Sequence, residues 1–168
     1  MPESVFDEDL RDVPVNSAAT RAYVGQLRSL LESTKTTRQR VSILGQIGVY
    51  LRQLGDLDQA ESTLKTALDL IEAYDLGIGV EIQQKIRLAH VFQWQRRFTE
   101  SDKLFGDILS VCRSSSEASH YLDFALQHSG KNHFDQGRWQ EALRAFEEAL
   151  RIRQMRRAPE DFCEFGNL

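Results

Sequence analysis

Apolar side chains recur at intervals of three and four residues along most of this chain, the spacing that places them on one face of an α-helix. The clearest stretches lie on either side of the turn-forming pair Gly55-Asp56. Their apolar and small positions are Val41, Leu44, Ile47, Gly48 and Leu51, then Leu57, Ala60, Leu64, Ala67, Leu68 and Ile71. This pattern predicts two helices joined by a short turn.

The helix pair is repeated with a period of 41 residues. A small residue recurs at that spacing, and a large apolar residue follows it four positions later. The members are Ala60 and Leu64, Ser101 and Phe105, and Ala142 and Phe146. A fixed period of this size is the signature of stacked supersecondary units, so we predict three repeats, over residues 41–74, 82–115 and 123–157.

A leading helix is predicted before the first repeat. Residues 16–32 carry an apolar stripe that includes Tyr23 and Leu27, and Asn16 or Ser17 can start the helix. This helix would cap the stack, so that the repeat domain covers residues 15–158. We expect the acidic residues 1–14 to be disordered and residues 159–168 to form a C-terminal tail.

Composition favours one all-α domain. The chain has 168 residues with only three prolines, and almost no stretch alternates in the way of a β-strand. It has neither an apolar run of about eighteen residues nor a basic and apolar N-terminus, so the sequence indicates no membrane span and no secretory signal, and we expect a cytoplasmic protein. The formal net charge of -4 argues against a general nucleic-acid binder.

Two of the repeats share a longer pattern. The first reads Leu44-x2-Ile47-Gly48-x2-Leu51 with Ala60-x3-Leu64, and the third reads Ser129-Gly130-x2-His133 with Ala142-x3-Phe146. This resembles the tetratricopeptide repeat, W-x2-L-G-x2-Y followed by A-x3-F over 34 residues. The chain departs from this pattern in lacking the late proline and in a period that is seven residues longer. The longer period is similar to that of the long-repeat branch found in kinesin light chains and several bacterial signalling proteins. The resemblance implies a right-handed α–α superhelix of three helix-turn-helix repeats behind the leading helix.

The resemblance also implies a candidate binding site, because in this family the first helices of the repeats line a concave groove. The matching positions are Arg52, Gln53, Gln83, Ile86, His90, Gln93, Trp94, Phe124, Gln127, Lys131 and Phe134. Their mixture of amides, cations and aromatic rings suits an extended or helical peptide, with Trp94 and Phe134 as anchors. The competing interpretation is that Trp94 and Phe134 fill the core between neighbouring first helices.

No catalytic or metal-binding pattern accompanies the repeats. The four histidines lack the paired spacing of zinc hydrolases, and Gly77-Ile78-Gly79 lacks the third glycine and the preceding strand of a phosphate-binding loop. Cys112 and Cys163 show no metal-type spacing. We therefore expect a protein that is not an enzyme and that needs no cofactor and no metal.

The last helix is expected to present apolar residues that no later helix covers, because Pro159 closes the segment. These residues are Leu143, Leu150, Ile152 and Met155. An uncovered apolar face marks an interaction surface. We expect a second copy of the chain to pack on it and form a homo-oligomer, or the tail to fold back with Phe162 and Phe165.

These observations predict a non-catalytic scaffold that binds a peptide or a partner protein in the groove. The alternative is a peptide-sensing regulatory module of a bacterial signalling system. A sensor usually needs an output domain or a second surface, and none is visible in the 168 residues, so the scaffold is favoured.

Overall fold

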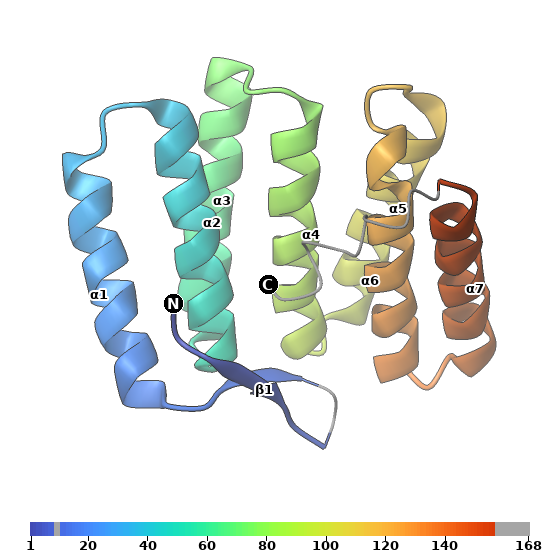
Figure 1. The fold of residues 1–168 in the computed structure, drawn as a ribbon, viewed down its shortest axis with the longest axis horizontal. Helices are drawn as coiled ribbons and strands as arrows, with labels where there is room; N and C mark the ends of the chain where they lie inside the picture. The colour runs from blue at the N-terminus through green and yellow to red at the C-terminus, as the bar shows by residue number, and fades with distance from the viewer. Residues whose placement is uncertain (9–10, 157–168) are drawn as a thin grey trace. The chain divides into compact units, whose positions relative to one another are not determined.

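A computed structural model of the chain describes residues 1–8 and 11–156, and helices dominate it (Figure 1). A short antiparallel ribbon precedes the helices. In chain order the elements are β1 (Ser4–Phe6), β2 (Asp12–Pro14), α1 (Ser17–Ser33), α2 (Thr37–Gln53), α3 (Leu57–Tyr74), α4 (Ile78–Trp94), α5 (Phe98–Ser114), the 3-10 turn η1 (Ser119–Tyr121), α6 (Leu122–Asp135) and α7 (Trp139–Met155). The prediction of an all-α helical repeat is confirmed.

The helix boundaries follow the 41-residue period. The second helices α3, α5 and α7 begin at Leu57, Phe98 and Trp139, and the first helices α2, α4 and α6 end at Gln53, Trp94 and Asp135. The position in the third repeat that matches the start of α4 is Ser119, where η1 begins. The first helices thus start about one turn before the predicted residues 41 and 82. In α2 the first turn, Thr37–Arg40, is polar and carries little apolar pattern, whereas the first turn of α4 contains the apolar Ile78 and Val80.

The chain divides into two compact units, with the boundary inside α5. Residues 1–108 form the first unit, where α2 lies beside both α3 and α4 (Figure 1). The second unit starts at Leu109 and contains the end of α5, η1 and the helix pair α6 and α7. Leu126, Ala149 and Ile152 form the core of that pair. Each unit therefore has an apolar core of its own.

Small residues lie where the two helices of a pair cross. A Cβ atom on Gly48 would come within 2.6 Å of Leu64 Cγ, and a Cβ on Gly130 within 2.7 Å of Phe146 Cε1. In the middle repeat Ser101 Oγ donates a hydrogen bond to the Ala89 carbonyl, at 2.9 Å. The small residues that recur with the 41-residue period thus mark places where two helix backbones come close together. Large side chains from the facing helix pack against them.

The turn inside each helix pair needs a left-handed residue. Gly55 and Gly137 have φ angles of 80° and 73°, and Arg96 holds the same place in the middle repeat with φ 58°. A side chain in this region strains the backbone, and glycine avoids the strain. The middle turn therefore keeps the shape of its neighbours although it lacks their glycine.

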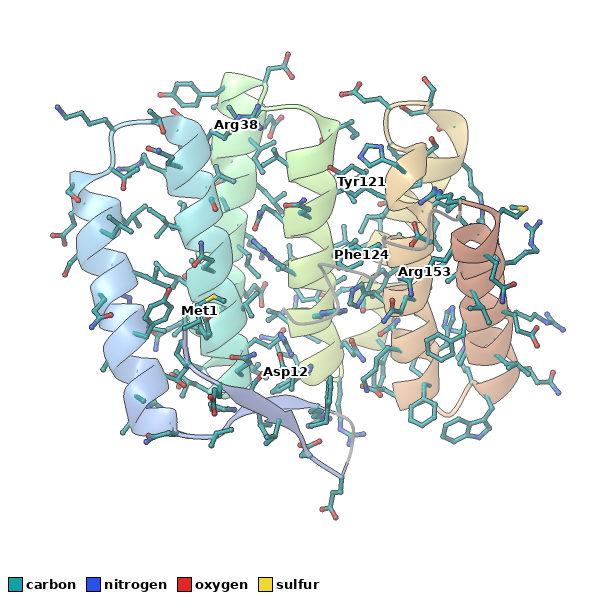
Figure 2. The ribbon with its side chains drawn as sticks, viewed as in Figure 1. Met1, Asp12, Arg38, Tyr121, Phe124 and Arg153 are labelled. Carbon is teal, nitrogen blue, oxygen red and sulfur yellow. The ribbon has the colours of Figure 1, made fainter. Side chains whose placement is uncertain are left out.

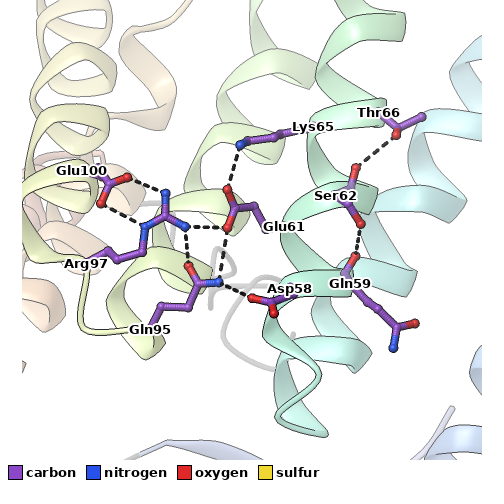
Figure 3. A network of polar contacts seen from close by, with 9 residues as sticks. All are labelled: Asp58, Gln59, Glu61, Ser62, Lys65, Thr66, Gln95, Arg97 and Glu100. Carbon is purple, nitrogen blue, oxygen red and sulfur yellow. Dashed lines mark hydrogen bonds and ion pairs between the residues drawn. The ribbon is translucent and has the colours of Figure 1, made fainter.

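A network of polar contacts holds the middle turn against α3 (Figure 3). Arg97 Nη1 donates to Glu61 Oε2 at 2.6 Å and to Gln95 Oε1 at 2.9 Å, and Arg97 also pairs with Glu100. Lys65 Nζ lies 2.7 Å from Glu61 Oε1. Burial acts to raise the pKa of Glu61, but hydrogen bonds from Lys65, Gln95 and Arg97 outweigh it and hold that pKa below its usual value. These contacts stabilise the middle turn, in which Arg96 and not glycine has the left-handed backbone conformation.

The leading helix forms as predicted. Asn16 caps α1, with Oδ1 accepting a hydrogen bond from the Ala19 backbone N–H at 3.0 Å. Tyr23 packs edge-on against Tyr50 of α2, with the ring centroids 5.3 Å apart. Leu27 is buried in the core of the first unit. This helix covers the side of α2 that would otherwise open the stack.

The expectation of a disordered N-terminus is wrong. Val5 pairs with Val13 in an antiparallel ribbon of three-residue strands. Ionic and hydrogen-bonding contacts of Asp12 attach the ribbon to α2. The prediction of disorder relied on the acidic composition of residues 1–14. A short segment that is held by specific polar contacts needs little apolar surface, so its composition does not reveal them. The predicted tail, residues 159–168, lies outside the described residues.

Candidate functional site

Three of the predicted groove residues of the first unit, Arg52, Gln53 and Trp94, meet at the C-terminal ends of α2 and α4. We call this surface the α2–α4 face and define it by Gly45, Arg52, Gln53, Arg87 and Trp94. The Arg52 guanidinium carbon lies 4.7 Å from the centre of the Trp94 ring, a cation–π distance. Arg52 and Gln53 are adjacent on α2 and both reach Asp12 of the ribbon. The structure thus brings three of the predicted residues together at one place.

The environment of Arg52 is unusual for a cation, because the side chain is only 9 % exposed. Burial lowers the pKa of Arg52 to about 10, and the negative charge of Asp12 opposes that shift. A guanidinium at this depth needs an anion or an aromatic face to offset the lost hydration. Asp12 and Trp94 supply both, so this end of the face is built to hold a carboxylate.

Other predicted residues lie deeper in the first unit. Ile86 and Gln93 are each only 2 % exposed, so they belong to the interior and not to an accessible groove. Their side chains point inward because an amphipathic helix flanked by neighbours buries more than one of its faces. Gln83 and His90 are half-buried, and the His90 ring lies 6.0 Å from that of Phe105. They remain at the edge of the candidate site.

The predicted residues of the second unit make contacts within that unit. Lys131 Nζ lies 2.9 Å from Asp135 Oδ1 and 5.8 Å from the centre of the Phe134 ring. Gln127 Oε1 accepts a hydrogen bond from Arg153 Nη2 at 2.5 Å. Phe134 is the most exposed of them, at 38 %. The α6 face therefore presents one aromatic ring beside one cation.

Phe124 makes an aromatic contact in the same unit. Its ring packs edge-on against His128, one turn further along α6, with the centroids 4.3 Å apart. The label in Figure 2 places Phe124 near Arg153 in that view, and Arg153 Nε lies 2.8 Å from Asp123 Oδ2. The pair of Arg153 with Asp123 joins α7 to α6 and so has a structural role, whereas the contact of Phe124 with His128 lies within α6.

The exposed apolar residues of α7 differ in part from the predicted set. Ile152 is buried at 8 % exposure and packs with Leu126, so its assignment to a contact surface is wrong. Leu143, Leu150 and Met155 are exposed as expected, and Trp139 and Phe146 join them. Spacings of four, three and four residues from Trp139 to Leu150 place these side chains on one face. We call Trp139, Leu143, Phe146 and Leu150 the α7 stripe.

Sequence models of a known family match this arrangement. A model described as a tetratricopeptide repeat matches residues 41–74, and a second model with that description matches residues 83–155. The chain belongs to the tetratricopeptide repeat family. Tetratricopeptide repeats are generally protein–protein interaction modules. No curated protein and no solved structure matches the chain significantly.

In this tetratricopeptide repeat protein the matched regions take in all three helix pairs. The matches identify the family as a whole, and the likeness to the kinesin light chain branch stays a resemblance. The longer period has a plain structural basis, because α2 and α3 are 17 and 18 residues long. Long helices extend the face on which a tetratricopeptide repeat presents side chains.

Three residues of the site were not expected from the sequence. Arg11 and Asp12 come from the N-terminal ribbon, and the guanidinium carbon of Arg11 lies 5.4 Å from the centre of the Trp94 ring. Arg87 packs across Gly45, with Nη1 where a Cβ on residue 45 would stand. Only the cation count of α4 could have pointed to Arg87, and nothing in the repeat pattern places Arg11 or Asp12 near Trp94.

Metal chemistry and membrane insertion find no support in the described part of this repeat protein. Among residues 1–8 and 11–156, no group of three or more histidine, cysteine, aspartate or glutamate side chains is arranged to hold a metal ion. No helix in the same residues combines the length and apolar character needed to cross a membrane. Cys112 is buried, and burial raises the pKa of its thiol. Cys163 lies outside the described residues.

Proposed function

We propose that this tetratricopeptide repeat protein is a scaffold that binds a peptide or a partner protein through side chains of its first helices, α2 and α4 in the first unit and α6 in the second. One observation carries the proposal: the α2–α4 face holds an extended segment of the chain itself, β2, through Arg52 and Gln53. A surface that binds one extended segment has the donors and the aromatic ring to bind another. The scaffold needs no reaction chemistry and acts by holding its partner.

Alanine in place of Trp94 or Lys131 is expected to weaken partner binding. Either change removes an aromatic or cationic anchor, and the loss of an anchor costs about 1.4 kcal/mol or more, which is about tenfold in affinity. Affinity capture followed by mass spectrometry identifies the partner, and titration calorimetry with that partner then measures both variants. Recovery of a short secreted peptide in the capture would favour the sensor over the scaffold.

A matched control for this experiment is Tyr74→Ala. Tyr74 is an aromatic side chain that is 62 % exposed, and it ends α3, which is not a first helix. Its removal should leave the affinity unchanged. Unchanged affinity in the Trp94 and Lys131 variants as well would show that these side chains of the first helices do not bind the partner.

We further propose that a second copy of the chain packs on the α7 stripe. Leu143 and Leu150 are 57 % and 56 % exposed, and Trp139 is 60 % exposed. Their spacing equals that of the apolar seam between two packed helices, so two copies of α7 can interlock through the same residues. The alternative occupant, the tail with Phe162 and Phe165, lies outside the described residues.

Light scattering tests this self-association. At tens of micromolar the protein is expected to have about twice its chain mass of 19.3 kDa, and the double variant Leu143→Ser/Leu150→Ser to have the single mass, because serine removes the apolar area that drives contact. Leu30→Ser is the control, since Leu30 is 51 % exposed on α1. A monomeric parent protein at that concentration would refute the proposal.

A further inference from the structure

The N-terminal ribbon is attached to the α2–α4 face mainly at one residue. Gln53 Nε2 donates a hydrogen bond to Asp12 Oδ2 at 2.5 Å, and Arg52 Nη2 lies 3.6 Å from the same oxygen. The side chains of Arg52 and Asp12 are 9 % and 17 % exposed, so the pair is largely removed from water. Figure 2 labels Asp12 at the ends of α2 and α4, where the ribbon meets them.

The neighbouring residue of the ribbon adds a second contact. Arg11 and Arg52 both approach the Trp94 ring, at 5.4 Å and 4.7 Å from its centre. Two cations around one ring repel each other, and the carboxylate of Asp12 next to Arg52 offsets that repulsion. The dipeptide Arg11-Asp12 therefore places a carboxylate against Arg52 and a guanidinium against Trp94.

Strand β1 contributes little to the attachment of the ribbon. Every residue of β1 is exposed, including Val5 at 52 % and Phe6 at 70 %. An isolated two-stranded ribbon is marginally stable in water. The ribbon can therefore leave the face without disturbing the apolar core of the first unit.

The same face holds a second cation, Arg87, in addition to Arg52. Arg87 is half-buried, and its hydrogen bond is to a neutral amide, with Nη1 3.1 Å from Gln84 Oε1. No carboxylate of the described residues forms an ion pair with Arg87. Burial lowers the pKa of Arg87, as expected for a cation that lacks an anion. An incoming carboxylate would supply the missing charge.

The distance between Arg87 and the site of Arg52 and Trp94 indicates the length of a ligand that could contact both. Arg87 and Trp94 are seven residues apart on α4, as are Gly45 and Arg52 on α2, which corresponds to about 10 Å along a helix. An extended peptide covers that distance in about three residues. Side chains alternate between the two faces of an extended peptide, so acidic residues an even number of positions apart, such as two or four, point the same way and can reach both places at once.

We propose that the α2–α4 face binds an extended peptide segment with two acidic residues, one in the place of Asp12 and one at Arg87, and that the ribbon occupies the first place until such a peptide displaces it. This inference rests on the proposed function and adds the chemistry of its ligand and a regulatory contact. The external peptide has the advantage of the second ion pair. The ribbon has the advantage of being attached to the same chain.

Removal of the Asp12 carboxylate tests the inference. The probe is a synthetic peptide with the sequence of residues 4–15, in which Glu8 and Asp12 lie four positions apart. In the ribbon the chain reverses direction between β1 and β2, so the two acidic residues are not on one extended segment, whereas the free peptide can extend across both places. Full-length protein with Asp12→Ala is expected to bind this peptide about tenfold more tightly than the parent, because a site that is open one tenth of the time loses about tenfold in apparent affinity. Fluorescence anisotropy of the peptide, labelled at its N-terminus, measures binding without any further substitution in the protein.

The control and a second variant complete the design. Glu3→Ala removes an exposed acidic side chain from the same ribbon and should leave the affinity of the parent. Adding Arg87→Ala to the Asp12→Ala protein is expected to remove about tenfold of the gain, because it abolishes the second ion pair. Circular dichroism checks that each variant keeps its helices.

The outcomes separate this inference from the proposed function. Equal peptide affinity in the parent and the Asp12→Ala protein, or no binding to either, overturns the inference, and partner capture that still depends on Trp94 would leave the scaffold standing. Tight peptide binding by the Asp12→Ala protein, together with partner capture that ignores Trp94 and Lys131, would support the intramolecular contact and overturn the scaffold.

Discussion

Replacing Leu64 by alanine is expected to lower the free energy of unfolding by about 2 to 5 kcal/mol, the cost of a buried leucine that becomes a cavity. Leu64 has no exposed surface and lies in the core of the first unit with Ile47 and Leu88. It also packs directly on Gly48, since a Cβ there would come within 2.6 Å of Leu64 Cγ. Urea unfolding followed by circular dichroism at 222 nm measures the change.

Leu30→Ala is the matched control for Leu64→Ala. Leu30 belongs to α1 of the same unit and is 51 % exposed, so its truncation should change the free energy of unfolding by less than about 0.5 kcal/mol. A loss at Leu64 no greater than that at Leu30 would mean that the crossing of α2 and α3 is not the core of the repeat. The position of Leu64 in the period would then have no energetic meaning.

The repeat pattern predicted most of the fold because the residues that recur with the period are those that contact each other between helices. Gly48 and Leu64 are 16 residues apart in the chain and touch across one crossing, and Gly130 and Phe146 repeat the contact. A pair that must fit together restricts both of its members, so the restriction is visible in one sequence. The starts of α3, α5 and α7 follow from the same columns.

Features outside the period could not be predicted in this way. The ribbon depends on a contact between Asp12 and Gln53 that occurs once in the chain, so no repetition marks it. The left-handed Arg96 was hidden because its conformation is imposed by the turn and supported by the Arg97 network. Single contacts of this kind depend on side chains that meet only after the helices have packed.

The same distinction divides the candidate site. The resemblance indicated Arg52, Gln53 and Trp94 because they follow the first helices in register. It also indicated Ile86 and Gln93, which are buried in the structure. The repeat register specifies on which face of a helix a residue lies, but it does not specify how far that residue is buried. The proposed role of Asp12 depends on packing that only the folded chain reveals.

A valine at Gly48 is expected to destabilise the first unit by about 3 kcal/mol, the upper range for an overpacked core. Its Cβ would lie within 2.6 Å of Leu64 Cγ, and both helices are held in place by their other neighbours. Gly25→Val in α1 is the control, since nothing lies within 4 Å of a Cβ there. That change should stabilise slightly, because valine has a higher helix propensity than glycine. Urea unfolding compares the two variants.

Combining Gly48→Val with Leu64→Ala provides the sharpest test of the crossing. The double variant moves three carbon atoms from one side of the contact to the other and so nearly conserves the core volume, which cores tolerate best. Its loss of stability should be smaller than the sum of the two single losses by at least about 1 kcal/mol, the coupling expected of residues in direct contact. Additive losses would show that the side chains at positions 48 and 64 do not occupy one shared space. The recurrence of small residues and the recurrence of large residues would then require separate explanations.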